Sequence, residues 1–358
     1  MGSLVCDMTE IRKGARIAYG ILDWGLGHAT RSIPLIQALL QHDCEVHIAS
    51  SGSALKLMAK EFPELPFHAL PAYDIHYKYQ PFWWGMVRQL PKIYKAFAQE
   101  HQQLLNWTQQ MHFSTIISDN RLGFYHPDIP SIYLTHQLQL ELGVWSEIAT
   151  QMHRHFMQQF QSVWVPDSKS QSLAGKLASP RAKGLPPTQY IGHPSRLPDL
   201  GDAVPEDGPI LLLLSGPEPQ RSRWEKWLYE QASALSKWQF VLVRGRIDAP
   251  ILPSIKHIQV ENLVNGERLH ELLKASRLVV ARSGYSTLLD LSRVNRPLVA
   301  VPTPGQGEQE YLARWHAEQR HLILGKQGEG YLMDMIESGL NFPGRLPQAQ
   351  PIGLPLQH

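Results

Sequence analysis

The sequence predicts an α/β protein built from two doubly wound parallel sheets. Three observations lead to this prediction. Short apolar runs alternate with helical patterns along most of the chain, the alternation occurs in two series, and a segment rich in Pro, Gly and Asp separates them at 194–209. At 358 residues the chain also exceeds the size of one typical hydrophobic core.

The first series opens with RIAYGIL (16–22), a short buried run typical of a strand. Ile33, Ile36 and Leu40 then recur at the spacing of one helix face, and EVHIAS (45–50) follows as a second strand. The further strands expected in this series are 115–119, 131–135, 162–166 and 190–194.

The second series opens with ILLLLSG (210–216) and repeats the pattern. Nearly continuous apolar strands are typical of parallel sheets that helices cover on both faces. The strands expected here are 240–245, 258–262, 278–284 and 297–302, with helices including 220–236 and 284–293.

The two series set the expected domain boundaries. We expect an N-terminal domain over 1–193, a linker over 194–209 and a C-terminal domain over 210–325. The remaining 326–358 should hold one helix and a Pro-rich tail that could be disordered. Because such folds bind ligands at the carboxyl ends of strands, we expect the two domains to face a central cleft.

Composition and charge argue against several classes of protein. Lys and Arg number 34 against 32 Asp and Glu, a net charge of +2, so no nucleic-acid partner is expected. Only two cysteines occur, without a CxxC, which disfavours a disulfide framework or a thiolate metal site. The first fifteen residues are charged and lack an apolar core, and no apolar run approaches the roughly 18 residues of a membrane span. We therefore expect a cytoplasmic protein.

A glycine-containing corner, GLGHATR (25–31), follows the first strand. Gly27 at a helix start can approach an anion, but the third glycine of a dinucleotide fingerprint is missing, and so is the acidic residue after the second strand. NAD is therefore disfavoured. His28 occupies the first helical turn, where the helix dipole favours a neutral imidazole that can act as a base. A helix cap or a hydrogen-bonded core histidine is the alternative interpretation.

The strongest pattern lies at 278–315. Ser283 and Gly284 stand between a strand and a helix, which is again the pattern of a phosphate site. Asp290 on that helix can accept from sugar hydroxyls, and Glu308 and Gln309 follow the next strand in a Pro/Gly loop. Phosphate, ribose and sugar contacts in this order predict one nucleotide-sugar site.

These residues resemble the donor-binding region of the GT-B glycosyltransferases, especially glycosyltransferase family 28. The family's R-S-G … E … Q-Q pattern is similar to Arg282-Ser283-Gly284 … Asp290 … Gln309-Glu310. The resemblance extends to GLGH (25–28), Ser-Gly (215–216) and YIGHPSR (190–196), in order over roughly residues 15–325. It implies the GT-B fold of two Rossmann-like domains.

The resemblance also implies residue roles. His28 would be the general base on the acceptor hydroxyl and Asp119, at a strand end, would orient it, although an ordinary strand-end or capping carboxylate is the alternative for Asp119. Asp290 replaces the family's usual Glu, which affects the expected contact with the ribose. Glu310 replaces an expected Gln, which affects the identity of the donor sugar. The residues expected to bind the donor are Gly27, Arg196, Ser215, Gly216, Asn262, Leu263, Arg282, Ser283, Gly284, Asp290, Glu308 and Gln309.

No metal or other cofactor is expected. The chain lacks Asp-x-Asp, and its histidines lack a metal-binding spacing such as H-E-x-x-H. Helix N-termini and arginine would then stabilise the departing UDP.

An aromatic and basic segment at 73–97 is the candidate for acceptor or membrane contact. Aromatic side chains beside basic ones can lie at an anionic lipid surface, and the resemblance implies lipid-linked acceptors; a buried or cleft-lining segment is the alternative. We expect a lipid or glycan acceptor and a cell-envelope role, in the cytoplasm or at the inner face of the cell membrane. The residues concerned are Phe82, Trp83, Trp84, Arg88 and Lys92.

The sequence thus predicts an inverting, metal-independent glycosyltransferase that moves a hexose or N-acetylhexosamine from a UDP-sugar to an acceptor hydroxyl. Three alternatives stay open. They are a nucleotide-sugar hydrolase on the same fold, with His28 activating water, a non-catalytic nucleotide-sugar binding protein, and a sugar 2-epimerase on a similar bilobed fold.

Overall fold

The computed structural model describes residues 10–73, 82–180, 184–201, 203–246, 250 and 252–357. The chain divides into two compact units. The first unit comprises Met1–Pro194 together with Gln350–His358, and the second comprises Ser195–Ala349.

The described strands of the first unit form one parallel sheet in the order β3-β2-β1-β4-β5-β6-β7. The order reverses between β1 and β4, which is the arrangement of a doubly wound fold. The strands are β1 (Arg16–Ile21), β2 (Glu45–Ser50), β3 (Phe67–Ala69), β4 (Thr115–Asp119), β5 (Ser131–Leu134), β6 (Ser162–Val165) and β7 (Thr188–Tyr190).

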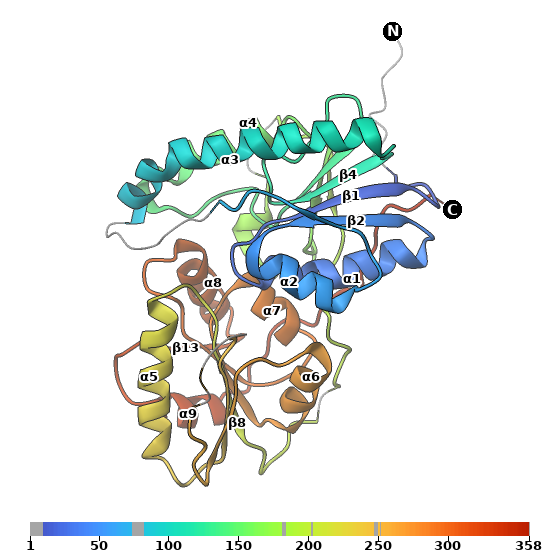
Figure 1. Ribbon diagram of the computed structural model, residues 1–358. Helices are drawn as coiled ribbons and strands as arrows, with labels where there is room; N and C mark the ends of the chain where they lie inside the picture. Colours follow the sequence, from blue (N-terminus) through green and yellow to red (C-terminus); the bar gives the residue numbers. More distant parts are fainter. Residues whose placement is uncertain are drawn as a thin grey trace. The chain divides into compact units, whose positions relative to one another are not determined.

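Helices cover both faces of this sheet, so its central strands are buried almost throughout (Figure 1). Ile17 and Tyr19 of β1 face the core under α1 and α2, whereas Ala18 faces the core that includes Leu104 of α3. This alternation follows from the two-residue period of a strand. The helices are α1 (Gly27–Gln41), α2 (Gly52–Glu61), α3 (Phe82–Gln110) and α4 (Ser146–Met157), with short turns η1 (Gly143–Trp145) and η2 (Gly175–Ala178).

The second unit repeats the architecture with the strand order β10-β9-β8-β11-β12-β13. Trp224 and Leu228 of α5, with Leu332 and Ile336 of α9, pack on one face of this sheet. The strands are β8 (Ile210–Leu213), β9 (Phe240–Val243), β10 (Ile258–Glu261), β11 (Leu278–Ala281), β12 (Leu298–Ala300) and β13 (Ile323–Leu324); the helices are α5 (Gln220–Ser233), α6 (Gly266–Ala275), α7 (Tyr285–Leu291), α8 (Gly307–Glu318) and α9 (Leu332–Leu340).

The predicted fold class of two parallel α/β sheets is therefore confirmed. The strand expected at 190–194 lies earlier, at β7, because Gly192 has a positive φ of 80° and turns the chain away. The sequence analysis also did not identify β3, β13 or α3; β3 and β13 are too short to show a pattern, and α3 contains Pro91.

The C-terminal end differs most from the sequence-based boundaries. Residues 195–209, expected as a separate linker, belong to the second unit, and the Pro-rich tail returns to the first unit. Residues 350–357 run beside 191–193, where Gly353 N–H donates to the Ile191 carbonyl, and end in a bridge between Leu356 and Ile11. Figure 1 shows this red end of the chain beside the blue strands.

The tail is docked by packing as well as by hydrogen bonds. Ile352, Leu354 and Leu356 pack against the core of the first unit. At Gly192 a Cβ atom would lie 2.0 Å from the Pro351 carbonyl oxygen, so the close crossing requires glycine. Residues 350–357 are therefore ordered against the first unit, although the composition of the tail allowed disorder.

Candidate active site

The first candidate group lies where the order of the first sheet reverses. His28 is in the first turn of α1, directly after β1, and Asp119 is the last residue of β4. Since β1 and β4 are parallel neighbours, their carboxyl ends bring these residues together although 91 positions separate them. His28 Nδ1 lies 2.9 Å from Asp119 Oδ1, so the predicted pair is in contact.

The pair is shielded unequally from solvent. The Asp119 side chain is fully buried, whereas the His28 side chain is 15% exposed. Among the described residues, every recorded hydrogen bond of the His28 ring is at Nδ1, and none is at Nε2. A partly exposed imidazole with one nitrogen against a buried carboxylate and no recorded partner on the other is the geometry of a general base that a carboxylate orients.

The sequence analysis overlooked Arg31, a side chain from α1 that is only 2% exposed. Its Nε donates to Asp119 Oδ2 at 3.0 Å, its Nη2 donates to Asp119 Oδ1, and its Nη1 lies 3.0 Å from His136 Nδ1. A helical arginine usually reaches solvent. The spacing of His28 and Arg31, three positions apart on one helix face, was the available signal.

The electrostatic environment of the pair follows from these contacts. Burial, followed by the positive charge of Arg31, lowers the pKa of His28, and the opposing effect of Asp119 does not restore it. Burial alone would raise the pKa of Asp119, but the charges of Arg31 and His28 and their hydrogen bonds hold it below its usual range. Near neutral pH the site thus combines a neutral imidazole with an ionised carboxylate.

The second candidate group lies where the order of the second sheet reverses, at the ends of β8 and β11. Gly284 precedes α7, and the buried Ser283 Oγ donates to the Gln309 carbonyl at 2.7 Å. Gln309 Oε1 in turn accepts from Thr303 N–H at 2.9 Å. Because the Ser283 hydroxyl has an internal partner, backbone N–H groups are the donors that this corner can offer to a ligand.

Arg282 lies deeper than the sequence analysis supposed. Its side chain is fully buried, Nη1 donates to the carbonyls of Val301 and Pro302, and the guanidinium lies 4.0 Å from the ring centroid of Trp224. Burial lowers its pKa to about 9. Arg282 therefore holds the loop after β12 in place, and only its Nε is left for a ligand.

Two side-chain atoms, Thr303 Oγ1 and Arg282 Nε, lie beside Gly216 in the loop after β8. In this loop Ser215 is half-buried and Gly216 is exposed. A Cβ at Gly216 would lie 3.1 Å from Thr303 Oγ1 and 3.8 Å from Arg282 Nε. Both atoms are buried and have no hydrogen-bond partner among the described residues. Two buried donors without partners, beside a glycine with a φ of 105°, fit an anionic ligand.

The predicted ribose ligand, Asp290, has partners within its own unit. It accepts from Ser195 Oγ at 2.8 Å, and Arg196 Nε lies 3.5 Å from its other oxygen. Burial raises the pKa of Asp290, and Arg196 and Ser195 oppose this shift. The structure thus brings together two predicted donor-binding residues, Arg196 and Asp290, as an ion pair.

The other predicted donor-binding residues lie at loops and helix starts. Asn262 Oδ1 accepts from Arg244 Nη1 at 2.8 Å, and Leu263 beside it is 37% exposed. Gly27 is the first residue of α1, and the half-buried Glu308 is in the first turn of α8. Glu310, which replaces an expected glutamine, accepts from Gly305 N–H at 2.9 Å and so fixes its own loop.

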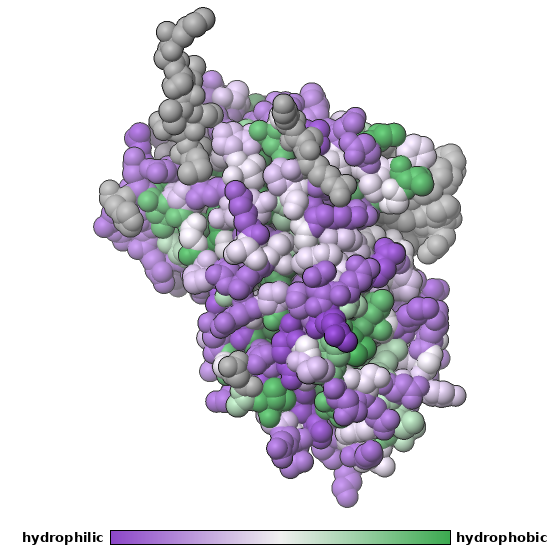
Figure 2. Space-filling model, turned by 180° about the vertical axis from the view of Figure 1, so that it is seen from behind, coloured by the Kyte–Doolittle hydropathy of each residue, from purple (hydrophilic) through white to green (hydrophobic). Residues whose placement is uncertain are grey.

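The predicted acceptor segment lies partly outside the described residues. The side chains of Phe82, Trp83, Trp84 and Arg88 are not described, whereas Lys92 on α3 is exposed. Elsewhere in the first unit, exposed apolar side chains gather at η1 and α4, a feature that the sequence analysis did not identify. They are Leu142, Val144, Trp145, Ile148 and Met152. The face shown in Figure 2 carries apolar side chains in separate patches among polar ones.

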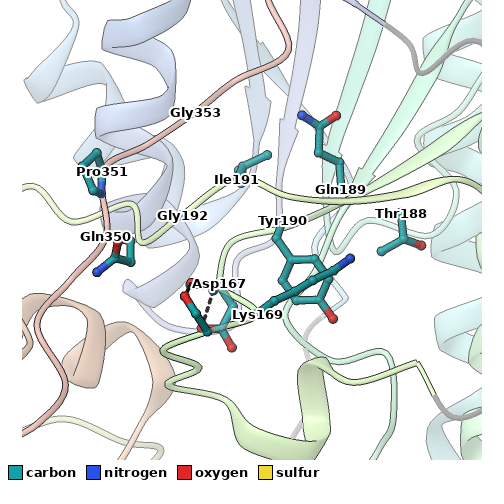
Figure 3. A pocket seen from close by; sticks show the side chains of 12 residues that line it. Asp167, Lys169, Thr188, Gln189, Tyr190, Ile191, Gly192, Gln350, Pro351 and Gly353 are labelled. Carbon is teal, nitrogen blue, oxygen red and sulfur yellow. Dashed lines mark hydrogen bonds between the residues drawn. The ribbon is translucent and has the colours of Figure 1, made fainter.

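A cavity of about 550 Å³ lies at the other end of the first sheet, beyond β6 and β7. It contains none of the predicted site residues. In Figure 3, Lys169 lies along the ring of Tyr190, 5.2 Å from its centroid, while Gln350 and Pro351 of the tail form the opposite wall. Polar and apolar residues both line this cavity, which lies where the tail contacts the first unit.

The described residues contain no group of three or more His, Cys, Asp and Glu side chains placed to hold a metal ion. None of their helices is both long and apolar enough to span a bilayer.

Comparisons with known proteins relate the chain to glycosyltransferases. Residues 248–327 match the glycosyltransferase family 28 C-terminal domain. An uncharacterized glycosyltransferase of Methanopyrus kandleri is 21% identical over 311 residues, which cover 80% of this chain and 82% of that protein. The UDP-N-acetylglucosamine–N-acetylmuramyl-(pentapeptide) pyrophosphoryl-undecaprenol N-acetylglucosamine transferase of Rhodococcus opacus is 33% identical over 117 residues, 31% of this chain and 30% of that protein.

Solved structures with the same fold include several glycosyltransferases. The glycosyltransferase of kitacinnamycin has a TM-score of 0.65 at 15% identity and covers 92% of this chain, with 90% of its own length matched. The calicheamicin glycosyltransferase CalG4 has a TM-score of 0.64 at 14% identity, with coverages of 93% and 91%. The chain thus has the two parallel α/β units of the GT-B fold, and its second unit contains the region that matches the glycosyltransferase family 28 C-terminal domain.

Proposed function

We propose that this glycosyltransferase moves a hexose or N-acetylhexosamine from a UDP-sugar to an acceptor hydroxyl, with inversion at the anomeric carbon and without a metal ion. The observation that carries the proposal is the contact between His28 Nδ1 and the buried carboxylate of Asp119, on a histidine side chain that is 15% exposed. His28 and Asp119 belong to the first unit, and most of the residues expected to bind the donor belong to the second.

The chemistry assigned to the pair is a single displacement. His28 Nε2 takes the proton of the acceptor hydroxyl as the oxygen attacks the anomeric carbon. The bond from that carbon to the diphosphate oxygen breaks, and its electron pair leaves with UDP. Asp119 stabilises the imidazolium that forms, and a positioned base of this kind contributes roughly 10²–10⁴-fold to the rate.

The departing diphosphate carries the charge that must be stabilised. Thr303 Oγ1 and Arg282 Nε are buried donors without partners beside Gly216, and the N-terminus of α7 adds backbone N–H groups at Gly284. Together they supply hydrogen bonds and positive charge without a cation. This set supports the metal-independent mechanism.

The donor base and sugar are proposed from the relatives. By its name, the Rhodococcus opacus relative uses UDP-N-acetylglucosamine, and its match favours a UDP-sugar here. One structural neighbour with a TM-score of 0.56, VinC, was solved with dTDP, which makes dTDP the informative competitor.

The acceptor is proposed to be lipid-linked and presented at the inner face of the cell membrane. The exposed apolar group at η1 and α4 includes Val144, which is 92% exposed, and Ile148, which is 53% exposed. Lys92 and Lys95 are exposed on α3. Apolar side chains in the same unit as exposed lysines suit an anionic bilayer surface.

The first test is calorimetric titration with UDP, dTDP and UDP-N-acetylglucosamine in the presence of a chelator. We expect UDP to bind more tightly than dTDP, and at 100 times its dissociation constant UDP should add about 2.7 kcal/mol of stability. Binding that requires a divalent cation would contradict the metal-independent mechanism.

The second test is turnover of the donor with His28→Ala. We expect a loss of at least about a hundredfold in kcat with UDP affinity nearly unchanged. Transfer to water alone, dependent on His28, would assign a nucleotide-sugar hydrolase. Binding without any turnover would assign a non-catalytic sugar-binding protein.

A further inference from the structure

Arg31 is an unusual component of the buried His28–Asp119 site. An arginine side chain that is 2% exposed must have its charge compensated within the protein. Both oxygens of Asp119 accept from it, Oδ2 from Nε at 3.0 Å and Oδ1 from Nη2. This two-point contact fixes the plane of the carboxylate as well as its distance.

The same guanidinium also approaches both neighbouring imidazoles. Its Nη1 lies 3.0 Å from His136 Nδ1, and its Nη2 lies 2.9 Å from His28 Nδ1. Arginine can only donate, so the His136 nitrogen must accept, and the proton of a neutral His136 is on Nε2. Arg31 therefore specifies the tautomer of His136.

At His28 two neighbours compete for one nitrogen. Asp119 Oδ1 and Arg31 Nη2 each lie 2.9 Å from Nδ1, but the carboxylate can only accept and the guanidinium can only donate. If Nδ1 carries the proton, it donates to Asp119 and Nε2 is a proton acceptor. If Nδ1 accepts from Arg31, the proton sits on Nε2 and the base is blocked.

The charge balance favours the first arrangement. The groups that act on the charge of His28 are Arg31 and Asp119, with a smaller effect of His136. Burial and the charge of Asp119 raise the pKa of Tyr19 and Tyr133 well above the usual range, so both phenols are neutral. The charges of Arg31 and Asp119 already cancel. Arg31 Nη2 donates to Asp119 Oδ1, and a proton on His28 Nδ1 can donate to the second lone pair of the same oxygen. A proton added to His28 would leave the buried group with a net positive charge.

We propose that Arg31 is a positioning residue for the general base: it holds the Asp119 carboxylate against His28 Nδ1 and keeps the resting imidazole neutral, with Nε2 free to take a proton. The shift in the pKa of His28 agrees with this, because the charge of Arg31 is the largest cause after burial. The catalytic part of the inference rests on the proposed function, whereas the tautomer and the neutral state are properties of the protein alone.

The decisive measurement is two-bond ¹H–¹⁵N correlation of histidine side chains in the labelled, ligand-free protein across a pH titration. His28→Asn assigns the His28 signals. In the wild type we expect a protonated Nδ1 and an unprotonated Nε2 at pH 7. The opposite tautomer in the wild type would overturn the proposal whatever the variants do.

Two substitutions separate charge from geometry. Arg31→Met removes both, and we expect the pKa of His28 to rise because the charge of Arg31 no longer opposes that of Asp119. Arg31→Lys keeps the charge but loses the planar fork, so the pKa should stay low while the two His28 tautomers become mixed. If Arg31→Met does not fold, Arg31→Lys alone tests the proposal. The wild-type tautomer of His28 in Arg31→Lys would then contradict the positioning role of Arg31.

The kinetic counterpart is the pH profile of kcat/KM. With Arg31→Met the acid limb should move upward in pH together with the His28 titration, with a tenfold or greater loss of kcat expected. A folded Arg31→Met variant whose acid limb and His28 titration both match the wild type would refute the proposal. Absence of transferase activity in the wild type would instead refute the proposed function and leave the spectroscopic result intact.

Discussion

Asp290 and Ser195 are joined by a hydrogen bond of 2.8 Å that spans 95 positions of the sequence. The carboxylate predicted to bind ribose is thereby tied to the segment that opens the second unit. A ribose would have to share Asp290 with Ser195 and Arg196, or displace them. Asp290 stands where the family has Glu, and its side chain is shorter by one methylene. Its contacts with Ser195 and Arg196 therefore bear directly on whether it can also reach a ribose.

Asp290→Ala and Ser195→Ala test the ribose assignment as a matched pair. Asp290→Ala should weaken UDP binding about tenfold or more, because a hydrogen bond to a charged group contributes about 1.5–3 kcal/mol. Ser195→Ala removes the internal bond and keeps the carboxylate, so the affinity should be unchanged or higher. Calorimetry decides, and equal affinities for the wild type and Asp290→Ala would remove Asp290 from the donor site.

Thr303→Val tests the anion site beside Gly216. Valine keeps the shape of threonine and removes the buried Oγ1, which has no partner among the described residues. UDP binding should fall about tenfold, while uridine, which lacks the diphosphate, should bind as before. A similar loss for both ligands would mean that Thr303 acts on the fold of the loop and not on the diphosphate.

The sequence was informative wherever neighbouring residues share one pattern. The continuous apolar runs at β1, β4, β8 and β11 predict buried parallel strands, and the ends of those strands carry His28, Asp119, Gly216 and Gly284. The location of both candidate groups could therefore be predicted, because the carboxyl ends of strands at a reversal of sheet order must converge.

The sequence was uninformative where a residue's role depends on a distant partner. Arg31 looks like an ordinary helical arginine until Asp119, 88 positions away, lies against it. Arg282 belongs to a phosphate-like pattern, yet it bonds the carbonyls of Val301 and Pro302. The docking of 350–357 depends on the packing of Ile352, Leu354 and Leu356, on a few backbone hydrogen bonds and on Gly192, and composition encodes none of these contacts.

The docked tail predicts a measurable effect of His193. This fully buried ring lies 2.8 Å from Asp167 Oδ1 through Nε2, and its Nδ1 accepts from Gln350 N–H at 2.8 Å. His193→Leu should leave the Gln350 N–H without its acceptor, whereas Asp167 keeps the bonds from Ser172 and from the backbone N–H groups of Ser168, Leu173 and Ala174. Hydrogen exchange at Gln350 and Gly353 should therefore become faster, since a buried unpaired group costs about 1–3 kcal/mol. His193→Asn keeps an acceptor near the Nδ1 position and should restore part of the protection. Unchanged exchange in His193→Leu would show that apolar packing alone holds the tail.

His28 should make stability depend on pH. Its pKa is lowered in the folded protein by burial and by Arg31, so between that lowered value and about 6.5 the unfolded chain binds more protons. The free energy of unfolding therefore rises with pH in this window and falls as the solution becomes more acidic. His28→Asn should flatten that part of the curve, whereas His155→Asn, at an exposed position on α4, should not. Equal slopes in the wild type and His28→Asn, measured by urea unfolding at pH 5–8, would contradict the lowered pKa.

The apolar group at η1 and α4 should bind an anionic bilayer if the acceptor is lipid-linked. Ile148 and Met152, 53% and 45% exposed, are four positions apart and share a helix face. Burying side chains of this size in lipid contributes roughly 1.5–3 kcal/mol each, so Ile148→Glu with Met152→Glu should reduce sedimentation with anionic vesicles at least about tenfold. Met333→Glu places one such charge at an exposed apolar position of the second unit and serves as the control. Undiminished vesicle binding by the double variant would exclude this face as the membrane contact, and absence of binding by the wild type would favour a soluble glycan acceptor.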